Sequence, residues 1–290
     1  MSAQRRRTDA FPTTLVPRTD HVPHVASHVA PDVLIRVVKI GGRAQGDPSL
    51  AHRLREAASG GATRLVVVHG GGDEVSALQR QLGGEPTFVN GRRVTRAREL
   101  DAVRMVLSGT VNKRLVAQLT VAGVRAVGIS GEDGGLLTAR VTDPDLGRVG
   151  GEVYSDATLV ADLLNAGWVP VISPLARDRE QATGEGLNVN GDDAAAAIAA
   201  SLGADELLFL ADVPGVLDGG RTVRTLDPVG ISDLVARGVA QGGMRAKLEA
   251  ATAALSNGVR RVRIADLAGV TDASAGTAVS LAPSPSKETA

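Results

Sequence analysis

The sequence contains no cysteine among its 290 residues. Disulfide bonds, thiolate metal sites and a cysteine nucleophile are therefore excluded by counting. Aromatic residues make up only 2% of the chain, which leaves almost no platforms on which nucleic-acid bases could stack. No charge of one sign is in excess, because 32 acidic residues balance 32 basic ones, whereas proteins that bind a phosphate backbone usually present a basic face. Nucleic acid is not expected as a partner.

Long hydrophobic runs are also missing. No apolar run approaches the roughly 18 residues of a membrane-spanning helix, and the first residues lack the basic-then-apolar order of a signal peptide. We therefore expect a cytoplasmic protein that does not contact a membrane. Hydrophobic residues make up 43% of the chain, which is enough to bury a sizeable core in one large domain or two lobes.

Proline and polar residues dominate both ends of the chain. Residues 1–31 contain four prolines with polar residues between them, a composition that sustains neither a helix nor a core. Residues 281–290 are also polar and interrupted by proline. We expect a disordered leader over residues 1–31 and a disordered tail over residues 281–290. The leader's histidines, His21, His24 and His28, are expected to be solvated rather than to bind a metal.

Between these ends, short apolar runs alternate with stretches of helical spacing. Six runs are apolar almost throughout, which is typical of strands buried on both faces of a parallel sheet. They cover residues 33–40, 65–68, 126–129, 169–172, 207–210 and 262–264. The stretches between them repeat leucine, valine and alanine at intervals of three and four residues, as amphipathic helices do. The sequence predicts an α/β fold with a mostly parallel central sheet and right-handed crossovers.

Glycine-rich segments and an aspartate follow several of these predicted strands. Gly41 and Gly42 follow the first strand, residues 70–72 are three glycines after the second, and Asp212 comes after a later one. Ligands of such sheets bind at the carboxyl ends of the strands. Bare amides at the start of a helix suit a carboxylate or a phosphate, although three glycines alone could equally form a tight strand-to-helix turn.

Two lysines accompany the glycines. Lys39 ends the first predicted strand beside Gly41, and we favour contact with a phosphate over a side chain that only reaches solvent. Lys247 is expected to lie in the first turn of a helix. A cation there opposes the helix dipole, and a bound anion would explain its presence.

Residues 188–192 carry two asparagines and an aspartate just before an alanine-rich helical run. Asp192 could serve only as a helix cap, but a loop of short polar side chains directed at a ligand explains all three residues. Arg93 could bind a carboxylate through two hydrogen bonds or could simply be solvated. For His69 we expect a structural role rather than that of a general base.

Seven motifs occur in a fixed order between residues 33 and 279. They are Lys-x-Gly-Gly, His-Gly-Gly-Gly, Asn-Gly-x-Arg-Val-Thr, Val-Asn-Lys, Gly-x-Ser-Gly-x-Asp-Gly, Asn-Val-Asn-x-Asp and Gly-Gly-Met-x-x-Lys. In this order the chain resembles the amino-acid kinase family and, within it, the acetylglutamate kinases. The resemblance implies a three-layer αβα sandwich of two lobes, a carbamate kinase-like fold. Residues 32–176 would bind the acyl amino acid and dimerise, and residues 177–280 would bind ATP.

The resemblance also implies roles for individual residues. Lys39 and Lys247 would stabilise the transition state, and Asp192 would hold both ammonium groups in place. The residues expected to hold the acylated glutamate are Gly71, Gly72, Arg93 and Asn188. Those expected to hold the nucleotide are Gly41, Gly42, Asp212, Val213, Pro214, Gly215, Val216, Leu217, Gly242, Gly243 and Met244.

The implied reaction moves the γ-phosphoryl group of ATP to the side-chain carboxylate of N-acetyl-L-glutamate, a step of arginine biosynthesis. Such a carboxylate, with a reference pKa of about 4.3, is already an anion at neutral pH and needs no base. Cations and amides must instead bring two anions together, with Mg²⁺ carried by ATP. No protein-held metal is expected. The chain lacks the G-x-x-x-x-G-K-[ST] motif, which excludes the P-loop class.

Two departures from the family concern the nucleotide and regulation. Ala211 stands where the family usually carries serine or threonine, and the stretch from Asp266 to Thr277 is shorter than in arginine-regulated members. The prolines of residues 1–31 make an N-terminal helix that joins a hexamer improbable. We therefore expect a homodimer that does not respond to arginine.

Three alternatives remain open. A sister kinase of the same fold could act on N-succinylglutamate or on aminoadipate linked to a carrier protein. A non-catalytic binding module of this fold would be expected to lose Lys39, Lys247 or Asp192, and all three are present. A nicotinamide oxidoreductase would need the complete G-x-G-x-x-G fingerprint, which residues 70–72 do not supply.

Overall fold

The computed structural model describes residues 33–59, 61–89, 91–181 and 183–282. The leader expected over residues 1–31 and all but the first two residues of the expected tail lie outside these ranges.

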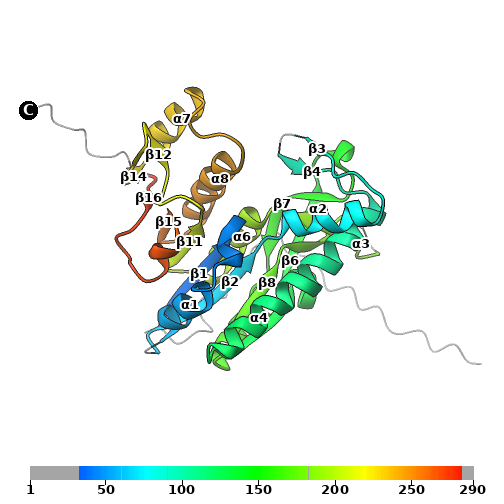
Figure 1. Cartoon of the computed structure of the whole chain (residues 1–290), viewed down its shortest axis with the longest axis horizontal. Helices are drawn as coiled ribbons and strands as arrows, with labels where there is room; N and C mark the ends of the chain where they lie inside the picture. The colour runs from blue at the N-terminus through cyan, green and yellow to red at the C-terminus, as the bar shows by residue number, and fades with distance from the viewer. Residues whose placement is uncertain (1–32, 60, 90, 182, 283–290) are drawn as a thin grey trace, which may run out of the picture.

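A sheet of eight strands forms the centre of the molecule, in the order β14-β16-β15-β11-β1-β2-β8-β5 (Figure 1). Its six longer strands are those predicted from the apolar runs, and they pair in parallel throughout. They are β1 (Leu34–Ile40), β2 (Thr63–His69), β5 (Ala126–Ser130), β8 (Val169–Ser173), β11 (Glu206–Leu210) and β15 (Arg261–Ala265). The prediction of an α/β fold with a mostly parallel sheet is confirmed. β14 (Thr225–Leu226) and β16 (Thr277–Val279) extend one edge, with β16 antiparallel to β15.

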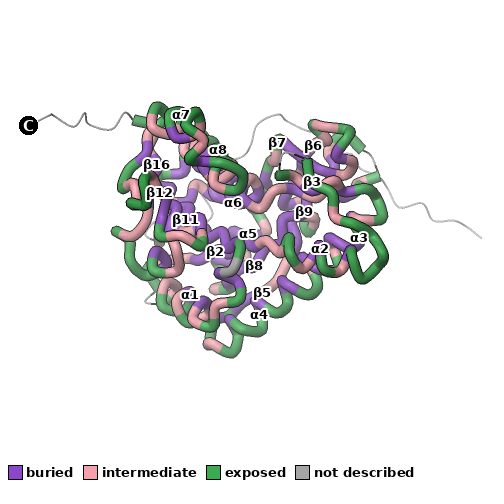
Figure 2. Tube along the Cα trace, turned by 45° about the horizontal axis from the view of Figure 1, so that its top comes forward, coloured by how far each residue is buried: buried purple, intermediate pink, exposed green. Residues whose placement is uncertain are grey.

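Helices cover both faces of this sheet and make three layers. Side chains such as Val37 and Phe209 pack on the face covered by α5 (Thr158–Asn165), α6 (Gly191–Leu202) and α8 (Gly242–Ser256). Their neighbours Val38 and Leu208 pack on the opposite face, against α1 (Leu50–Ala58), α3 (Ala97–Arg104) and α4 (Asn112–Val121). Each fully buried side chain of this size contributes roughly 1.5–3 kcal/mol, which explains why these strands read as continuous apolar runs. Figure 2 shows buried residues along the central strands.

Seven residues between α3 and α4 form a π-helix, η3 (Met105–Val111). Together the three segments make one long helical rod beside β5 and β8. The turns of a π-helix are wider than those of an α-helix, and they often lie near functional sites. Here Leu107 and Val111 of the π-helix pack against Gly71.

A smaller sheet closes into a barrel with the order β10-β7-β6-β9. Its strands are β6 (Leu137–Val141), β7 (Val149–Ser155), β9 (Leu175–Asp178) and β10 (Gly186–Val189). The sequence did not predict this barrel. β7 contains Gly150, where a Cβ would lie 2.8 Å from Ala139 and 2.9 Å from Val189, so glycine is needed for the strands to close. The expectation of a loop of polar side chains at residues 188–192 is wrong for Asn188, which lies in β10, and for Asp192, which lies in α6 (Gly191–Leu202).

Shorter elements complete the chain. They are α2 (Gly72–Gln81), α7 (Pro228–Ala236), the hairpin of β3 (Phe88–Val89) and β4 (Arg92–Arg93), the hairpin of β12 (Leu217–Asp218) and β13 (Arg221–Thr222), and the 3-10 turns η2 (Gly42–Gly46), η4 (Asp133–Gly135), η5 (Pro144–Leu146) and η6 (Leu267–Val270). No helix in the described ranges is long and apolar enough to span a membrane. The division into two lobes at residue 176 stays a prediction, and β1 pairs with β11 across it.

Candidate active site

A cleft of about 260 Å³ opens at the carboxyl ends of β1 and β2. The β3–β4 hairpin, the π-helix and the start of α6 form its other walls. Six of the residues predicted from the sequence line it together: Lys39, Gly71, Gly72, Arg93, Asn188 and Asp192. Ligands of parallel sheets bind at this edge, and the chain has gathered these residues there from β1, β4, α6, β10 and the turn before α2.

Asp192 forms ion pairs with both lysines. Its Oδ1 lies 2.8 Å from the Nζ of Lys39, and its Oδ2 lies 3.3 Å from the Nζ of Lys247. The carboxylate is 3% exposed. Burial opposes its ionisation, but the positive charges of Lys39 and Lys247 outweigh burial and hold the pKa of Asp192 below its usual value. A single carboxylate thus keeps two ammonium groups from β1 and α8 close together.

Lys247 does not lie where the sequence suggested. α8 begins at Gly242, so Lys247 is the sixth residue of the helix rather than a residue of its first turn. Lys247 therefore does not oppose the helix dipole from the first turn, as the sequence had led us to expect. The ion pair with Asp192 gives another reason for a cation at this place. Burial, followed by the charge of Lys39, lowers the pKa of Lys247.

Asn190 rather than Asp192 caps α6. The side-chain oxygen of Asn190 accepts the N–H of Asp192 at 2.7 Å, which satisfies a free amide of the first turn. The carboxylate of Asp192 therefore remains free to pair with the two lysines.

Asn188 donates from Nδ2 to the Oγ1 of Thr95 at 3.0 Å. Thr95 is fully buried. Its position at the end of the Asn-Gly-x-Arg-Val-Thr motif was the signal for this partner, which sequence reasoning missed.

Glycines let charged groups and backbone approach closely at this edge. A Cβ on Gly41 would lie 2.8 Å from the Nζ of Lys39, and one on Gly42 would lie 2.8 Å from the carboxylate of Asp212. Gly71 has a φ of +153°, and its Cβ would lie 2.8 Å from the side chain of Leu107. Gly72 begins α2, so the amides of this turn lie at the positive end of a helix, where anions bind.

Arg93 is held by α2 and by the hairpin. Its guanidinium donates to the carbonyl of Gly72 and to the Oγ of Ser76, both at 2.7 Å, and to the side-chain oxygen of Gln79. It also lies 4.6 Å from the centre of the Phe88 ring. Burial lowers its pKa. Sequence reasoning missed Ser76 and Gln79, which are three residues apart and therefore share one face of the helix.

The residues expected to hold the nucleotide lie outside this cleft. Asp212 borders a second hollow, of about 420 Å³, together with Ala211 and Asp266. Gly41 and Gly42 lie between the two hollows, since Gly41 lies close to Lys39 of the cleft and Gly42 lies close to Asp212 of the second hollow. Leu217 begins β12, Met244 packs against the core, and Gly242 and Gly243 open α8. Side chains added at these last two glycines would meet nothing within 4 Å.

Thr277 fastens the segment after β11. Its hydroxyl accepts the N–H of Val216 at 2.8 Å and donates to the carbonyl of Val223 at 2.6 Å. A Cβ on Gly215 would lie 2.7 Å from this hydroxyl. Gly276, just before Thr277, has a φ of +94°, a backbone conformation that favours glycine.

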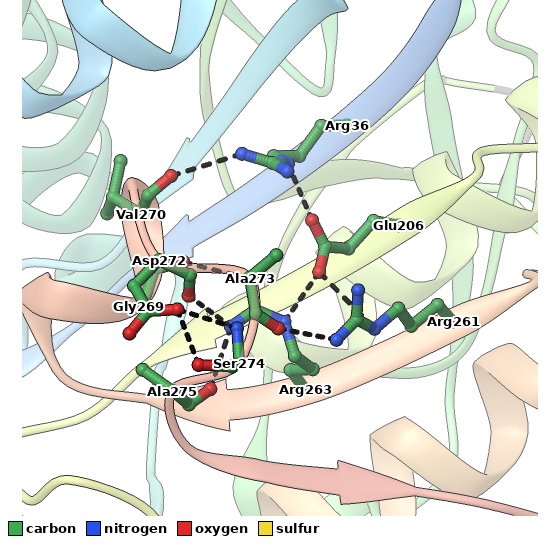
Figure 3. A network of polar contacts seen from close by, with 10 residues as sticks. All are labelled: Arg36, Glu206, Arg261, Arg263, Gly269, Val270, Asp272, Ala273, Ser274 and Ala275. Carbon is green, nitrogen blue, oxygen red and sulfur yellow. Dashed lines mark hydrogen bonds and ion pairs between the residues drawn. The ribbon is translucent and has the colours of Figure 1, made fainter.

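A buried polar network holds the chain just before Thr277 (Figure 3). Arg263 is 1% exposed, and it contacts Glu206 at 2.6 Å. It also donates to three backbone carbonyls, those of Gly269, Asp272 and Ala275. Arg36 contacts the other oxygen of Glu206, also at 2.6 Å. Sequence reasoning missed this network, whose signal was an arginine in the middle of an apolar strand.

His69 lies under the site in a structural position. It is fully buried, its Nδ1 donates to the carbonyl of Gly70 at 2.8 Å, and its Nε2 accepts from Asn112 at 3.1 Å. The network assigns this neutral tautomer. Burial lowers the pKa of His69 to about 4. Both ring nitrogens are occupied, which fits the structural role predicted for it.

The described residues contain no group of three His, Asp or Glu side chains arranged to hold a metal ion. The cleft instead brings together cations, backbone amides and one carboxylate that is already paired with two lysines. Such a set suits an anionic ligand.

Comparison with known proteins gives one consistent family. The model of the amino acid kinase family matches residues 35–266. The chain is 44% identical over 241 residues to the acetylglutamate kinase of Chloroflexus aurantiacus, which covers 82% of this chain and 94% of that protein. It is 46% identical over 234 residues to the acetylglutamate kinase of Cereibacter sphaeroides, with 79% of each chain covered. The carbamate kinase of Giardia shares the fold, with a TM-score of 0.66 at 18% identity over 86% of this chain and 99% of that one.

Proposed function

We propose a function for this chain from one premise: it belongs to the amino acid kinase family. The chain is an enzyme that transfers the γ-phosphoryl group of ATP to the side-chain carboxylate of N-acetyl-L-glutamate, in arginine biosynthesis. The products are ADP and N-acetyl-L-glutamyl 5-phosphate. The observation that carries this proposal is the bridge that Asp192 makes between Lys39 and Lys247, because the reaction depends on cations held where two anions meet.

The reaction needs positioning more than acid–base chemistry. The attacking carboxylate is ionised at neutral pH, so no residue has to remove a proton from it. Asp192 already accepts two charged partners and is poorly placed to act as a base. Its role is to keep Lys39 and Lys247 aimed at the transferred group, where their charges offset the negative charge of the transition state.

The acyl amino acid would lie in the cleft beside the glycine turn. Gly71 and Gly72 would offer backbone amides, Asn188 would hold a polar group of the substrate, and Arg93 would face its carboxylate. Arg93 is oriented by Gly72, Ser76 and Gln79, so its guanidinium pays little ordering entropy on binding.

The nucleotide would lie on the other side of Lys39. Gly41, Gly42, the residues from Asp212 to Leu217, and the start of α8 at Gly242, Gly243 and Met244 would contact it. Mg²⁺ would arrive bound to ATP and would offset part of the negative charge of its phosphates. Asp192, the one carboxylate that lines the cleft within the described ranges, is already paired with Lys39 and Lys247, which supports a metal that arrives with the nucleotide.

Trapping of the product tests this function. Hydroxylamine converts an acyl phosphate to a hydroxamate, so we expect hydroxamate and ADP in equal amounts from ATP and N-acetyl-L-glutamate. Parallel reactions with N-succinyl-L-glutamate, with free glutamate and with aminoadipate bearing a blocked amino group compare the remaining substrates. Hydroxamate formed only from one of these alternative substrates would overturn the assignment of N-acetyl-L-glutamate as the substrate but would leave the assignment of a kinase intact. ATP turnover without any hydroxamate would overturn both.

We further propose that the enzyme is a homodimer whose activity does not respond to arginine. The short segment between Asp266 and Thr277 supports this proposal, since Arg263 and its carbonyl partners already occupy it. The prolines of residues 1–31, which made an N-terminal helix improbable, lie outside the described residues. Light scattering that gives a hexamer, or a rise in the KM for the acyl amino acid with millimolar arginine, would contradict it. A cytoplasmic location stays a prediction from the sequence.

A further inference from the structure

Another hollow, separate from the cleft and from the hollow beside Asp212, lies at the opposite edge of the sheet from Lys39. It has a volume of about 200 Å³ and is bordered by the end of α1, the start of β2, the turn after α4 and the turn before β8. Figure 1 shows α1 and α4 reaching this edge together. β2 runs from Thr63 at the hollow to His69 beneath the active site, and at about 3.3 Å per residue the two sites are roughly 20 Å apart.

The walls of this hollow are basic. Arg55, Arg64 and Arg125 line it together with the hydroxyl residues Ser59 and Thr63, and no aspartate or glutamate among the described residues does so. None of the three arginines forms an ion pair with a carboxylate of the described ranges. The chain as a whole has no net charge, so three unpaired guanidiniums around one hollow are a local excess of positive charge.

One of the arginines is held in place by an aromatic ring. The guanidinium carbon of Arg125 lies 4.6 Å from the centre of the Trp168 ring. Stacking of this kind orients the planar group and leaves the N–H donors at its rim available. Trp168 is the only tryptophan of the chain.

These arginines are not needed to cap the helices that end here, although cations commonly do so at the ends of helices. The last carbonyls of α4 accept the backbone N–H groups of Ala122, Gly123 and Val124. Those of α5 accept N–H groups of residues 166–168 in the same way. In α1, the backbone N–H and the hydroxyl of Ser59 bond to Glu56 and Arg55 respectively. Within the described ranges, none of the three guanidiniums donates a hydrogen bond to a helix carbonyl.

We propose that this hollow binds a small anion that carries phosphate groups and at least two negative charges. Arginine is the side chain best suited to grip phosphate oxygens through paired hydrogen bonds. Three arginines and two hydroxyls fit a compact polyanion, either inorganic or the phosphate end of a nucleotide. The site lies outside the kinase cleft, so its occupation is independent of the function proposed above.

Calorimetric titration of pyrophosphate into the full-length protein tests the site. We expect Arg64→Gln and Arg125→Gln each to weaken a component of binding about tenfold, since each removes charge-assisted hydrogen bonds. Arg64→Lys keeps the positive charge but lacks the paired N–H donors of a guanidinium, so it should give a smaller loss of affinity. Arg260→Gln is the matched control, because Arg260 lies at the same edge but pairs with Asp205 at 2.7 Å.

Binding in the kinase cleft remains in all of these variants, so the component lost in the Arg64 and Arg125 variants reports the new site. Their kinase activity without pyrophosphate should equal that of the unchanged protein, which shows that they are folded. A second titration, with a nucleoside diphosphate, separates the two sources. If the component lost in the variants binds the nucleoside diphosphate more tightly than pyrophosphate, the natural ligand is a nucleotide. If it binds the nucleoside diphosphate equally or more weakly, the natural ligand is the inorganic anion. Identical isotherms for the unchanged protein, Arg64→Gln and Arg125→Gln would overturn the proposal.

Discussion

The hydroxyl of Thr277 accepts the backbone N–H of Val216 at 2.8 Å. One side chain of the edge strand β16 therefore fixes the segment that follows β11, where the nucleotide is proposed to bind.

Thr277→Val should weaken nucleotide binding. The valine has the same shape but leaves the N–H of Val216, a buried residue, without a partner. An unsatisfied buried donor costs about 1–3 kcal/mol. We expect a higher KM for ATP with an unchanged KM for the acyl amino acid, measured by steady-state kinetics. Thr277→Ser keeps the hydroxyl and should restore most of the affinity. Equal changes in both Michaelis constants would argue against this local effect.

The lysines and Arg93 should differ in the step that they affect. Lys39→Ala and Lys247→Ala should each lower kcat by about 10²–10³, because they act mainly on the charge of the transition state. Arg93→Ala should chiefly raise the KM for the acyl amino acid, because it holds that substrate before and during the reaction. Initial rates over both substrate concentrations separate these effects. The opposite pattern would exchange the two roles.

Asp192→Asn should move the alkaline limb of the pH–rate profile to lower pH. Burial and then the charge of Lys39 lower the pKa of Lys247, whereas the charge of Asp192 raises it. Removal of that negative charge lowers the pKa further, so the ammonium loses its proton at a lower pH. We also expect kcat at neutral pH to fall by about tenfold or more, because both lysines lose their anchor.

Asp193→Asn is the matched control for this change. Asp193 is the next residue of α6, and its carboxylate lies 3.7 Å from Arg92 rather than beside the lysines. The alkaline limb of the pH–rate profile of Asp193→Asn should lie at the same pH as that of the unchanged protein. A limb that moves equally in both variants would mean that Lys247 does not set it.

The stability of the protein should fall as the pH drops from about 7 to about 5. Burial lowers the pKa of His69 to about 4 in the folded protein, whereas an unfolded histidine titrates near 6.5. Between these values the unfolded chain binds the extra proton, so acid favours unfolding. The loss should be about 2 kcal/mol over this interval. Urea unfolding at both pH values measures it, and the loss should disappear in His69→Gln. The same loss in that variant would assign it to other groups.

Glu206→Gln should destabilise the fold strongly. Glu206 shares its carboxylate between Arg36 and Arg263 (Figure 3), and its removal leaves a buried guanidinium without an opposite charge. Breaking such a buried pair typically costs about 3–5 kcal/mol. Glu249→Gln breaks the exposed pair with Arg245 and should cost less than about 1 kcal/mol. Denaturant unfolding compares them, and equal losses would show that burial does not matter here.

The central sheet could be predicted because burial on both faces leaves a direct mark on the sequence. Residues 65–68 in β2 and 207–210 in β11 are all apolar and buried, so no alternation of apolar and polar residues had to be detected. The barrel left no such mark. β7 holds two adjacent glycines, which normally weaken a strand. Only the folded barrel explains them, because a Cβ on Gly150 would meet Ala139 and Val189, and one on Gly151 would meet Thr142.

The site was predictable where one motif carries its own chemistry. Lys39 and Asp192 could be chosen from the residues beside them in the chain. The partners of Arg93 and the network of Arg263 could not, because they depend on which elements pack together. Lys247 shows a mixed case: the structure places it beside Asp192, but the reason given for choosing it failed with the start of α8.

The π-helix between α3 and α4 determines which way the second half of that rod faces. Each residue of an α-helix turns the chain by about 100°, so the wider turns of residues 105–111 change the direction of every side chain that follows. Asn112, the first residue of α4, reaches the Nε2 of His69 and the carbonyl of Val171 only at this rotation. A uniformly α-helical rod would turn its amide away, and the imidazole beneath the glycine turn would lose the neighbour that selects its tautomer.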